Sequence, residues 1–195
     1  MVYDNIDLYI VRHAETYQNI EARIQGQMES SLTPRGIRQA HYLGEALKGA
    51  DIRYILSSDL GRARQTSQMI KRYLGDVEIA YTPDLRERSF GRLEGKLVSE
   101  CGLLDAEDIY PDEGGALELE PLSGVMQRMQ VVSHRLRAEG PCLIVGHECS
   151  NSYLINELLQ EGFIFHPQDN CSIHRLVLKD DVEICRLNIR GGDYR

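Results

Sequence analysis

Short apolar runs alternate along the chain with longer stretches whose apolar residues recur at helical spacing. The runs predict strands at about 6–11, 53–56, 77–81, 142–145, 173–178 and 182–187. The longer stretches predict helices at about 34–48, 60–74, 121–138 and 149–160. Because strands that alternate with helices form a parallel sheet covered on both faces, we expect an α/β fold. Its form is a three-layer α/β/α sandwich around a mostly parallel central sheet.

Local signals set the boundaries of these elements. Thr33 and Pro34 have the residue types of an N-cap and a first helical position. The residues 57–59, Ser-Ser-Asp, offer caps for the helix predicted at 60–74. Residues 14–32 show little periodicity and are predicted as a loop. A chain of 195 residues with 42% hydrophobic content can bury one substantial core, so we expect a single domain over 1–195.

The charge is distributed unevenly. The net charge of −8 disfavours nucleic acid as a partner. Nearly all of the excess negative charge lies in residues 96–120, which contain eight acidic residues and one basic residue, Lys96. A run of like charge is usually a solvated face. The irregular stretch 85–120 is long for a structureless connection inside a domain, which indicates a functional, mobile or partly helical segment.

The sequence also bounds the cellular setting. No apolar stretch approaches the roughly 20 residues that span a bilayer, and the N-terminus lacks the pattern of a secretory signal, so we expect no membrane partner. The five cysteines are an odd number without a C-x-x-C pair, which favours free thiols and a cytoplasmic localisation. The oligomeric state stays open, a homodimer included.

Two histidines follow predicted strands. Arg12 and His13 end the first strand, and His147 follows the strand at 142–145. In a parallel sheet both histidines reach the same carboxyl edge, where ligands bind. The helix that follows the second strand carries Arg62 and Arg64 on its first turns, where backbone N–H groups favour anions. Polar strand ends that merely meet water are the alternative, but together these residues predict a phosphate site without a metal.

Several motifs now resemble the histidine phosphatase superfamily, the phosphoglycerate mutase-like group. They occur in family order between residues 6 and 178. The motifs are Arg12-His13-Ala14-Glu15-Thr16 with Asn19, Gln25-Gly26, Leu32-Thr33-Pro34-Arg35-Gly36, the run Ser57 to Thr66, Leu85-Arg86-Glu87, the run Phe90 to Gly95, Gly146-His147 and Asn170-Cys171-Ser172-Ile173. Each motif is weak alone, and together they are specific.

The resemblance implies a role for each matching position. His13 resembles the nucleophile that becomes phosphohistidine, and Glu87 resembles the general acid. The residues implied to hold the phosphate oxygens are Arg12, Arg62 and His147. The residues implied to line the pocket are Asn19, Gln25 and Gly26. No cofactor is implied.

Physical chemistry agrees with these roles. A neutral imidazole can attack phosphorus if its other nitrogen donates to a fixed acceptor, for which we expect a nearby backbone carbonyl. The leaving alkoxide needs a proton, and a bound phosphate dianion would raise the pKa of Glu87. His13 and Glu15 have the spacing of a metal-ligand pair, but the sequence offers no clear further ligands. Glu94 is predicted to bond backbone amides of its own turn.

The chain departs from the family at a few positions. Glu148 stands where family members often carry glycine, so its carboxylate would repel phosphate unless it turns away or contacts a cationic part of the substrate. Phe90 stands where mutases usually carry tyrosine, and the chain is shorter than typical mutases. These departures favour a phosphatase. If the acidic segment 96–120 is a cap or insertion over the pocket, it disfavours strongly anionic substrates.

The sequence thus predicts a metal-independent phosphatase that hydrolyses a small phosphorylated metabolite, a phosphomonoester, through phosphohistidine on His13. We expect the leaving group to be neutral or cationic. Two alternatives stay open. One is a phosphoglycerate mutase-type phosphotransferase, and the other is a catalytically weak module that only binds phosphate esters, for which Glu148 is the motivating feature.

Overall fold

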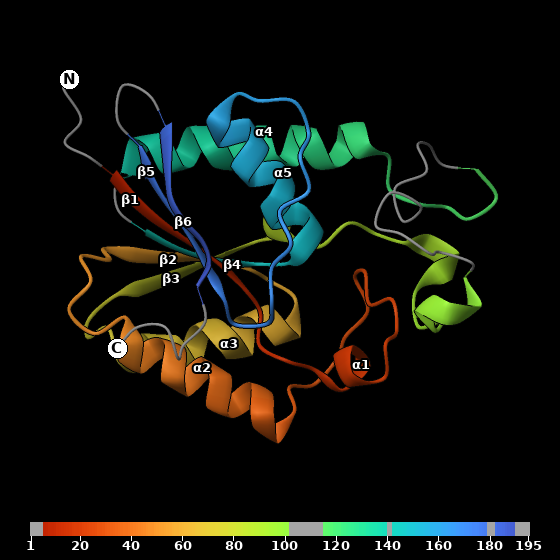
Figure 1. Ribbon diagram of the computed structural model, residues 1–195, viewed down its shortest axis with the longest axis horizontal. Coiled ribbons are helices and arrows are strands. Elements are labelled where there is room, and N and C mark those ends of the chain that lie inside the picture. The colour runs from red at the N-terminus through yellow and green to blue at the C-terminus, as the bar shows by residue number, and fades with distance from the viewer. Residues whose placement is uncertain (1–5, 102–114, 140–141, 179–181, 190–195) are drawn as a thin grey trace.

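A computed structural model describes residues 6–101, 115–139, 142–178 and 182–189 of the chain, although not the side chains of 137–139 and 182–189. A twisted sheet lies between two layers of helices, with α4 and α5 on one face and α2 and α3 on the other (Figure 1). The predicted α/β/α sandwich is therefore confirmed.

The sheet has six strands in the order β3-β2-β4-β1-β5-β6. Their bounds are β1 (Ile6–Arg12), β2 (Tyr54–Ser58), β3 (Glu78–Thr82), β4 (Cys142–Gly146), β5 (Ile173–Leu178) and β6 (Val182–Ile189). The first four strands in this order are mutually parallel. β5 runs antiparallel to both β1 and β6, so the sheet is mostly parallel, as predicted.

The helices follow the predicted pattern with two local differences. Their bounds are α1 (Tyr17–Ile20), α2 (Pro34–Ala46), α3 (Gly61–Lys71), α4 (Leu122–Glu139) and α5 (Glu148–Leu159). Short 3₁₀ turns cover η1 (Pro83–Leu85), η2 (Gly91–Leu93) and η3 (Val98–Glu100). Thr33 caps α2 as predicted, since its hydroxyl accepts from the Gly36 N–H. The predicted side-chain cap of α3 is wrong, because β2 extends through Ser58 and Leu60 occupies the N-cap. The region predicted as a loop also contains the single turn α1.

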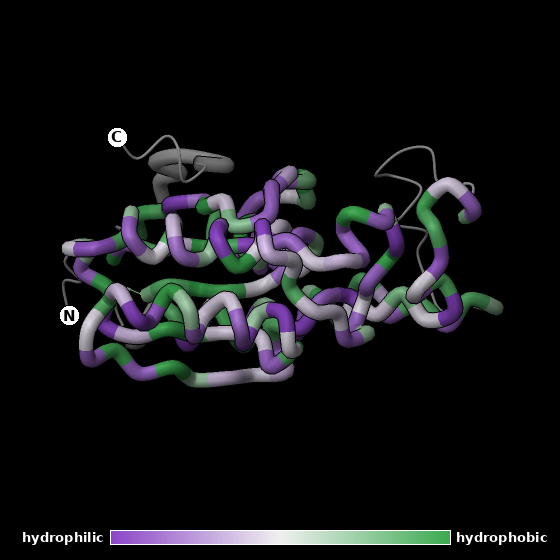
Figure 2. The backbone as a smooth tube through the Cα atoms, turned by 90° about the horizontal axis from the view of Figure 1, so that it is seen from below, coloured by the Kyte–Doolittle hydropathy of each residue, from purple (hydrophilic) through white to green (hydrophobic). Residues whose placement is uncertain are grey.

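Two apolar clusters flank the sheet because successive strand residues point to opposite faces. On one face Ile144 packs in a cluster with Met129 of α4. On the other face Leu143 and Val145 pack in a cluster with Ile70 of α3. Every residue of β4 is buried, as expected for a central strand covered on both sides. The flanking helices alternate hydrophilic and hydrophobic residues along the tube in Figure 2, in keeping with one buried and one exposed side.

The acidic segment is described at its two ends. There, Glu118 forms an ion pair with Arg92, and Glu120 forms one with Arg128. The acids between positions 105 and 113 lie outside the described residues, as does most of the predicted cap. In the part that the structure describes, arginines outside the segment therefore neutralise two of its carboxylates.

Two further searches cover the described residues alone. No helix among them is long and apolar enough to cross a membrane. Within the same ranges, no three His, Cys, Asp or Glu side chains gather in the manner of a metal site. The four cysteines whose side chains the structure describes carry free thiols, at Cys101, Cys142, Cys149 and Cys171.

Candidate active site

The two strand-end histidines meet at the carboxyl edge of the sheet. In the parallel pairing of β1 with β4, Arg12 lies opposite Gly146, so the next residues are His13 and His147. The His13 N–H donates to the Gly146 carbonyl at 3.0 Å, which locks the two strand ends together. The imidazole rings lie 5.2 Å apart between centroids, with planes tilted by 56°. The structure thus brings together two histidines that lie more than 130 positions apart in the sequence.

His13 is oriented as a nucleophile requires. Its side chain is buried, and Nδ1 lies 2.8 Å from the Ala14 carbonyl oxygen. Because a carbonyl only accepts, this contact makes Nδ1 the protonated nitrogen of the neutral ring and leaves the lone pair on Nε2. Burial, and then the charges of Arg62 and Arg12, hold the pKa of His13 well below its ordinary value. The ring is therefore neutral at physiological pH.

Arg62 lies on the first turn of α3 and is almost fully buried. Its Nη1 donates to the Met28 carbonyl at 2.9 Å and its Nη2 to the Gly26 carbonyl at 2.7 Å. Burial lowers the pKa of Arg62 to about 10, so the guanidinium stays protonated at neutral pH. Two backbone carbonyls thus fix the orientation of a buried positive charge.

Arg64 does not reach the site. It is exposed on the outer side of α3, where its guanidinium lies 4.0 Å from the centre of the Tyr81 ring. The helical repeat explains the difference, because residues two positions apart on a helix face different directions.

His147 is completely buried at the N-cap of α5. Its Nε2 shares a hydrogen bond of 2.9 Å with the Ser58 hydroxyl at the end of β2. Burial and the nearby Arg62 lower its pKa well below the ordinary value. Three parallel strands therefore contribute to one neutral, ordered pair of imidazoles.

Several buried polar atoms at this edge have no hydrogen-bond partner among the described residues. They are Arg12 Nε, Arg62 Nε, His147 Nδ1 and Gln25 Oε1. A buried donor that makes no hydrogen bond costs about 1–3 kcal/mol, so several such atoms gathered at one place need an explanation. Three nitrogens from the residues around His13 suit a ligand that presents several oxygen atoms.

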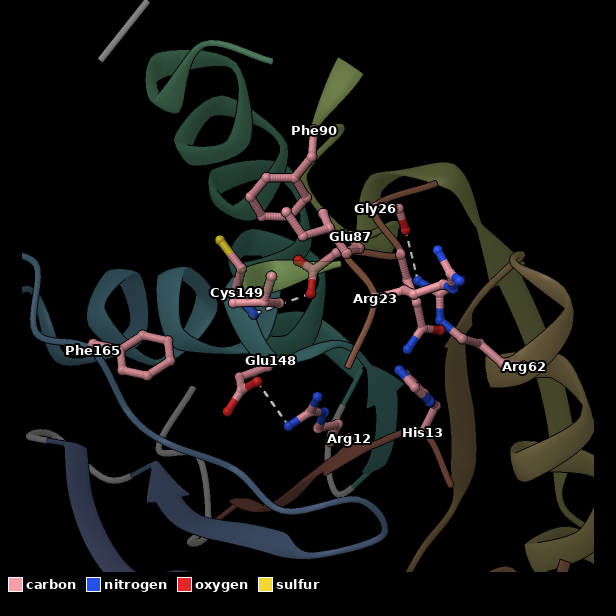
Figure 3. A pocket seen from close by; sticks show the side chains of 13 residues that line it. Arg12, His13, Arg23, Gly26, Arg62, Glu87, Phe90, Glu148, Cys149 and Phe165 are labelled. Carbon is pink, nitrogen blue, oxygen red and sulfur yellow. Dashed lines mark hydrogen bonds and ion pairs between the residues drawn. The ribbon is translucent and has the colours of Figure 1, made fainter. Parts of the chain in front are cut away.

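Glu148 turns its carboxylate onto Arg12. Glu148 Oε2 lies 2.7 Å from Arg12 Nη1, as the dashed line in Figure 3 shows. The same Nη1 donates to the Gln168 carbonyl at 2.6 Å, and Glu148 Oε1 accepts from the Gln168 N–H. The sequence left open whether this carboxylate would face the phosphate. In the structure it forms an ion pair with Arg12, the arginine expected to hold phosphate, and lines the cavity.

Glu87 is buried on an irregular segment that follows η1. Its carboxylate accepts backbone N–H groups from Arg88 at 2.9 Å, Cys149 at 3.2 Å and Ser150 at 3.1 Å. The last two donors belong to the first turn of α5. Burial raises the pKa of Glu87 against these hydrogen bonds and the charge of Arg62, which lower it. The sequence argument attributed a raised pKa of Glu87 to a bound phosphate dianion. The structure adds a second cause, the burial of the carboxyl group.

Gly26 occupies a position that only glycine fits. Its φ is +51°, and an added Cβ would lie 2.1 Å from Glu94 Oε1. Glu94 accepts from the backbone N–H groups of Gln27 at 3.0 Å and Phe90 at 2.9 Å. The predicted structural role of Glu94 is confirmed, and the same carboxylate ties the Gly26 loop to the Phe90 segment.

Asn19 lies behind the cavity rather than on its wall. The cavity is lined by Arg12, His13, Arg23, Ile24, Gln25, Gly26, Arg62, Glu87, Phe90, Val98, Glu148, Cys149 and Phe165. Asn19 Oδ1 accepts from the Thr16 backbone N–H at 3.0 Å and from Asn170 Nδ2 at 3.2 Å, within the cap of α1. Its position therefore supports the loop that follows His13.

The cavity of about 170 Å³ also has walls that sequence reasoning missed. Arg23, Ile24, Val98 and Phe165 come from irregular segments and one 3₁₀ turn, far apart in the chain. Arg23 is held by Glu21 at 2.7 Å and by the Gly95 carbonyl at 2.8 Å. These residues have no shared spacing, so no sequence pattern could have grouped them.

Known proteins resemble the chain over nearly its whole length. Residues 8–189 match the model of the histidine phosphatase superfamily, branch 1. A probable phosphoglycerate mutase GpmB of Yersinia pestis (strain Pestoides F) is 34% identical over 184 residues, covering 88% of this chain and 84% of that protein.

Solved structures share the fold. The alpha-ribazole phosphatase from Shigella flexneri has a TM-score of 0.79 at 25% identity, covering 94% of this chain and 96% of that one. A mycobacterial glucosyl-3-phosphoglycerate phosphatase, solved with VO3, has a TM-score of 0.82 at 22% identity, covering 94% and 99%. With the family model and the GpmB relative, these findings show that the chain belongs to branch 1 of the histidine phosphatase superfamily, the phosphoglycerate mutase-like group.

Proposed function

We propose that the protein is a metal-independent phosphomonoester hydrolase that works through phosphohistidine on His13. The observation that carries this proposal is the set of unpaired buried nitrogens around a neutral, oriented imidazole. A phosphoryl group offers the oxygen atoms that those nitrogens lack. Because Arg12 and Arg62 already supply positive charge at the equatorial oxygens, the reaction needs no metal ion there.

The first step transfers the phosphoryl group to the enzyme. The lone pair of His13 Nε2 forms the N–P bond while the P–O ester bond breaks and its electron pair moves to the leaving oxygen. Glu87 donates a proton to that oxygen, and its raised pKa keeps a larger share of the carboxyl protonated. The Ala14 carbonyl stabilises the positive charge that develops on the imidazole through the Nδ1 hydrogen bond.

The second step returns the enzyme to its starting state. Water attacks phosphorus and gives its proton to the Glu87 carboxylate. The N–P bond breaks, and its electron pair returns to His13 Nε2. Inorganic phosphate leaves, and Glu87 is again the acid that the next turnover requires.

The outer cavity favours a leaving group with an apolar part. Ile24, Phe90, Val98 and Phe165 line it, together with the ion-paired Arg12 and Glu148. Apolar walls bind an apolar substrate surface by removing it from water. We therefore propose a small phosphorylated metabolite whose alcohol is uncharged and partly apolar, rather than a bisphosphate.

A mutase is the second candidate, because the GpmB relative shares 34% identity over most of both chains. Phe90 on the cavity wall favours hydrolysis, since it lacks the hydroxyl expected of a mutase at that position. Product analysis separates the two reactions. We expect release of inorganic phosphate from simple esters to exceed isomerisation of phosphoglycerate, and the opposite ratio would favour the mutase.

The decisive test traps the phosphoenzyme. We expect an acid-labile phosphohistidine in the wild-type protein, inhibition by vanadate and no effect of chelators. His13→Ala lowers turnover by at least about 10⁴-fold, because the nucleophile is lost. His41→Ala is the control, since that histidine bonds the Tyr73 hydroxyl on the other side of the fold. Turnover retained by His13→Ala would reject the mechanism, and ester binding without any phosphoenzyme would favour a binding module.

A further inference from the structure

Glu87 lies on a segment that regular secondary structure does not hold. Residues 86–90 follow η1 and precede η2 and belong to no helix or strand. A general acid must keep its proton within hydrogen-bond reach of the leaving oxygen, so something else must fix this segment. The Glu87 carboxylate itself accepts two amides of α5, and Glu94 accepts the Phe90 N–H. The backbone on either side of Glu87 is further held by two side chains outside the cavity, Arg128 and Glu120.

Arg128 holds the backbone on one side of Glu87. It projects from α4, and its Nη1 donates to the Asp84 carbonyl at 2.5 Å and to the Arg86 carbonyl at 2.9 Å. The Arg86 carbonyl belongs to the peptide unit that leads into Glu87. The guanidinium therefore fixes the peptide plane between Arg86 and Glu87, and with it the direction in which the Glu87 side chain leaves the backbone.

Glu120 holds the backbone on the other side. Its Oε2 accepts the Ser89 N–H at 3.0 Å, and its own N–H donates to the Ser89 carbonyl at 2.9 Å. Its carbonyl accepts from Arg88 Nε at 2.8 Å. The segment is thus tied down immediately before and immediately after Glu87.

Arg128 and Glu120 also bind each other. Arg128 Nε and Nη2 donate to Glu120 Oε1 and Oε2 at 2.8 and 2.9 Å, a bidentate pair with side chains less than a fifth exposed. Paired guanidinium and carboxylate groups give a geometry that a single contact does not. Neither residue lines the cavity, so neither touches substrate.

Resting on the proposed function, we propose that Arg128 and Glu120 form a clamp that positions the general acid Glu87. The clamp contributes to the step in which the leaving oxygen takes up its proton. It contributes little when the leaving group departs without a proton. The dependence of the rate on the leaving group therefore separates positioning from a merely structural role.

The experiment compares kcat/KM for an alkyl phosphate with kcat/KM for p-nitrophenyl phosphate, whose phenolate leaves without protonation. Each kcat/KM value reports the steps up to formation of the phosphoenzyme, before water attacks it. We expect Arg128→Lys, which keeps the charge but not the fork, to lose at least about tenfold on the alkyl ester and less than about twofold on the aryl ester. Glu87→Gln sets the upper limit of the same selective loss.

Arg92→Lys is the matched control, because Arg92 forms an exposed pair with Glu118 nearby. We expect Arg92→Lys to leave kcat/KM unchanged for both esters. Equal losses on both esters for Arg128→Lys, or no loss on either, would overturn the clamp. If that variant does not fold, Glu120→Gln, which preserves side-chain shape, takes its place. We expect Glu120→Gln to lose kcat/KM on the alkyl ester and not on the aryl ester. A wild-type protein inactive on both esters would instead refute the proposed function.

Discussion

The two halves of the cavity are built in different ways. One half, called the phosphate half after the proposed function, has Arg12, His13 and Arg62 on its wall, and the buried His147 lies next to His13 outside the lining. Each of these residues lies at a strand end or on the first turn of a helix. The leaving-group half consists of residues from irregular segments, among them Glu87 and Phe165. In the first half the main-chain hydrogen bonds of the sheet place Arg12 and the two histidines, and two loop carbonyls orient Arg62. In the second half side chains hold the backbone.

This difference matches the demands of the chemistry. Every phosphomonoester presents the same phosphoryl group, so its site can be rigid and rest on the sheet edge. The alcohol differs from substrate to substrate, and loops tolerate changes of sequence that a central sheet does not. The proposed Arg128–Glu120 clamp adds fixed geometry to Glu87, the one residue of the second half that would act on every substrate in the proposed mechanism.

The largest effect is expected in the phosphate half. Arg62→Lys keeps a positive charge but cannot bind the Gly26 and Met28 carbonyls and the phosphate together. We expect kcat/KM to fall by about 10²–10³-fold on every ester, whatever its alcohol. Arg64→Lys, on the exposed side of the same helix, is the control. A fall in kcat/KM for the esters of only some alcohols would contradict the separation of the two halves, because Arg62 would then also act on the alcohol.

A second effect is a pH dependence that should distinguish the halves. In the proposed mechanism neutral His13 is the active form, and its lowered pKa keeps it neutral as the pH falls below 6.5. Protonated Glu87 is the active form of the proposed acid, and its raised pKa extends that form above the ordinary range before it is lost as the pH rises. We expect kcat/KM for an alkyl phosphate to fall about tenfold per pH unit on the alkaline side.

The aryl ester provides the control for this profile, because its leaving group needs no proton. Its phosphate loses the second proton at a lower pH than that of an alkyl ester, so the two profiles are compared above the pH at which both esters are dianions. We expect a smaller alkaline decline with p-nitrophenyl phosphate. Superimposable profiles for the two esters would contradict the assignment of Glu87 as the acid.

The smallest effect is expected in the leaving-group half. Phe165→Ala removes apolar wall from the cavity, so we expect kcat/KM to fall up to about tenfold for an ester with an apolar alcohol and to change little for methyl phosphate. Phe163→Ala is the matched control, since Phe163 stacks on Tyr153 and lies outside the cavity lining. Equal effects on both esters would show that Phe165 supports the phosphate half.

The phosphate half was largely predictable from the sequence. Strand-end positions can be read from apolar runs, and parallel pairing brings their carboxyl ends together, so His13 and His147 could be placed at one edge. Glu148 shows the limit of such reasoning. The sequence locates it after His147, but only the fold places Gln168 and Arg12 where they hold its carboxylate.

The layered fold, the histidine pair and the family motifs could be read from the amino-acid order, because these depend on local periodicity and on residues close to strand ends. Only three-dimensional packing brings Arg62 rather than Arg64 into the site, places Asn19 behind it and selects the loops that form the apolar wall. The same packing brings Arg128 and Glu120 to the backbone on either side of Glu87. Those contacts join α4 and Glu120 to the irregular segment 86–90 across long sequence separations, where no repeat or spacing constrains which side chains meet.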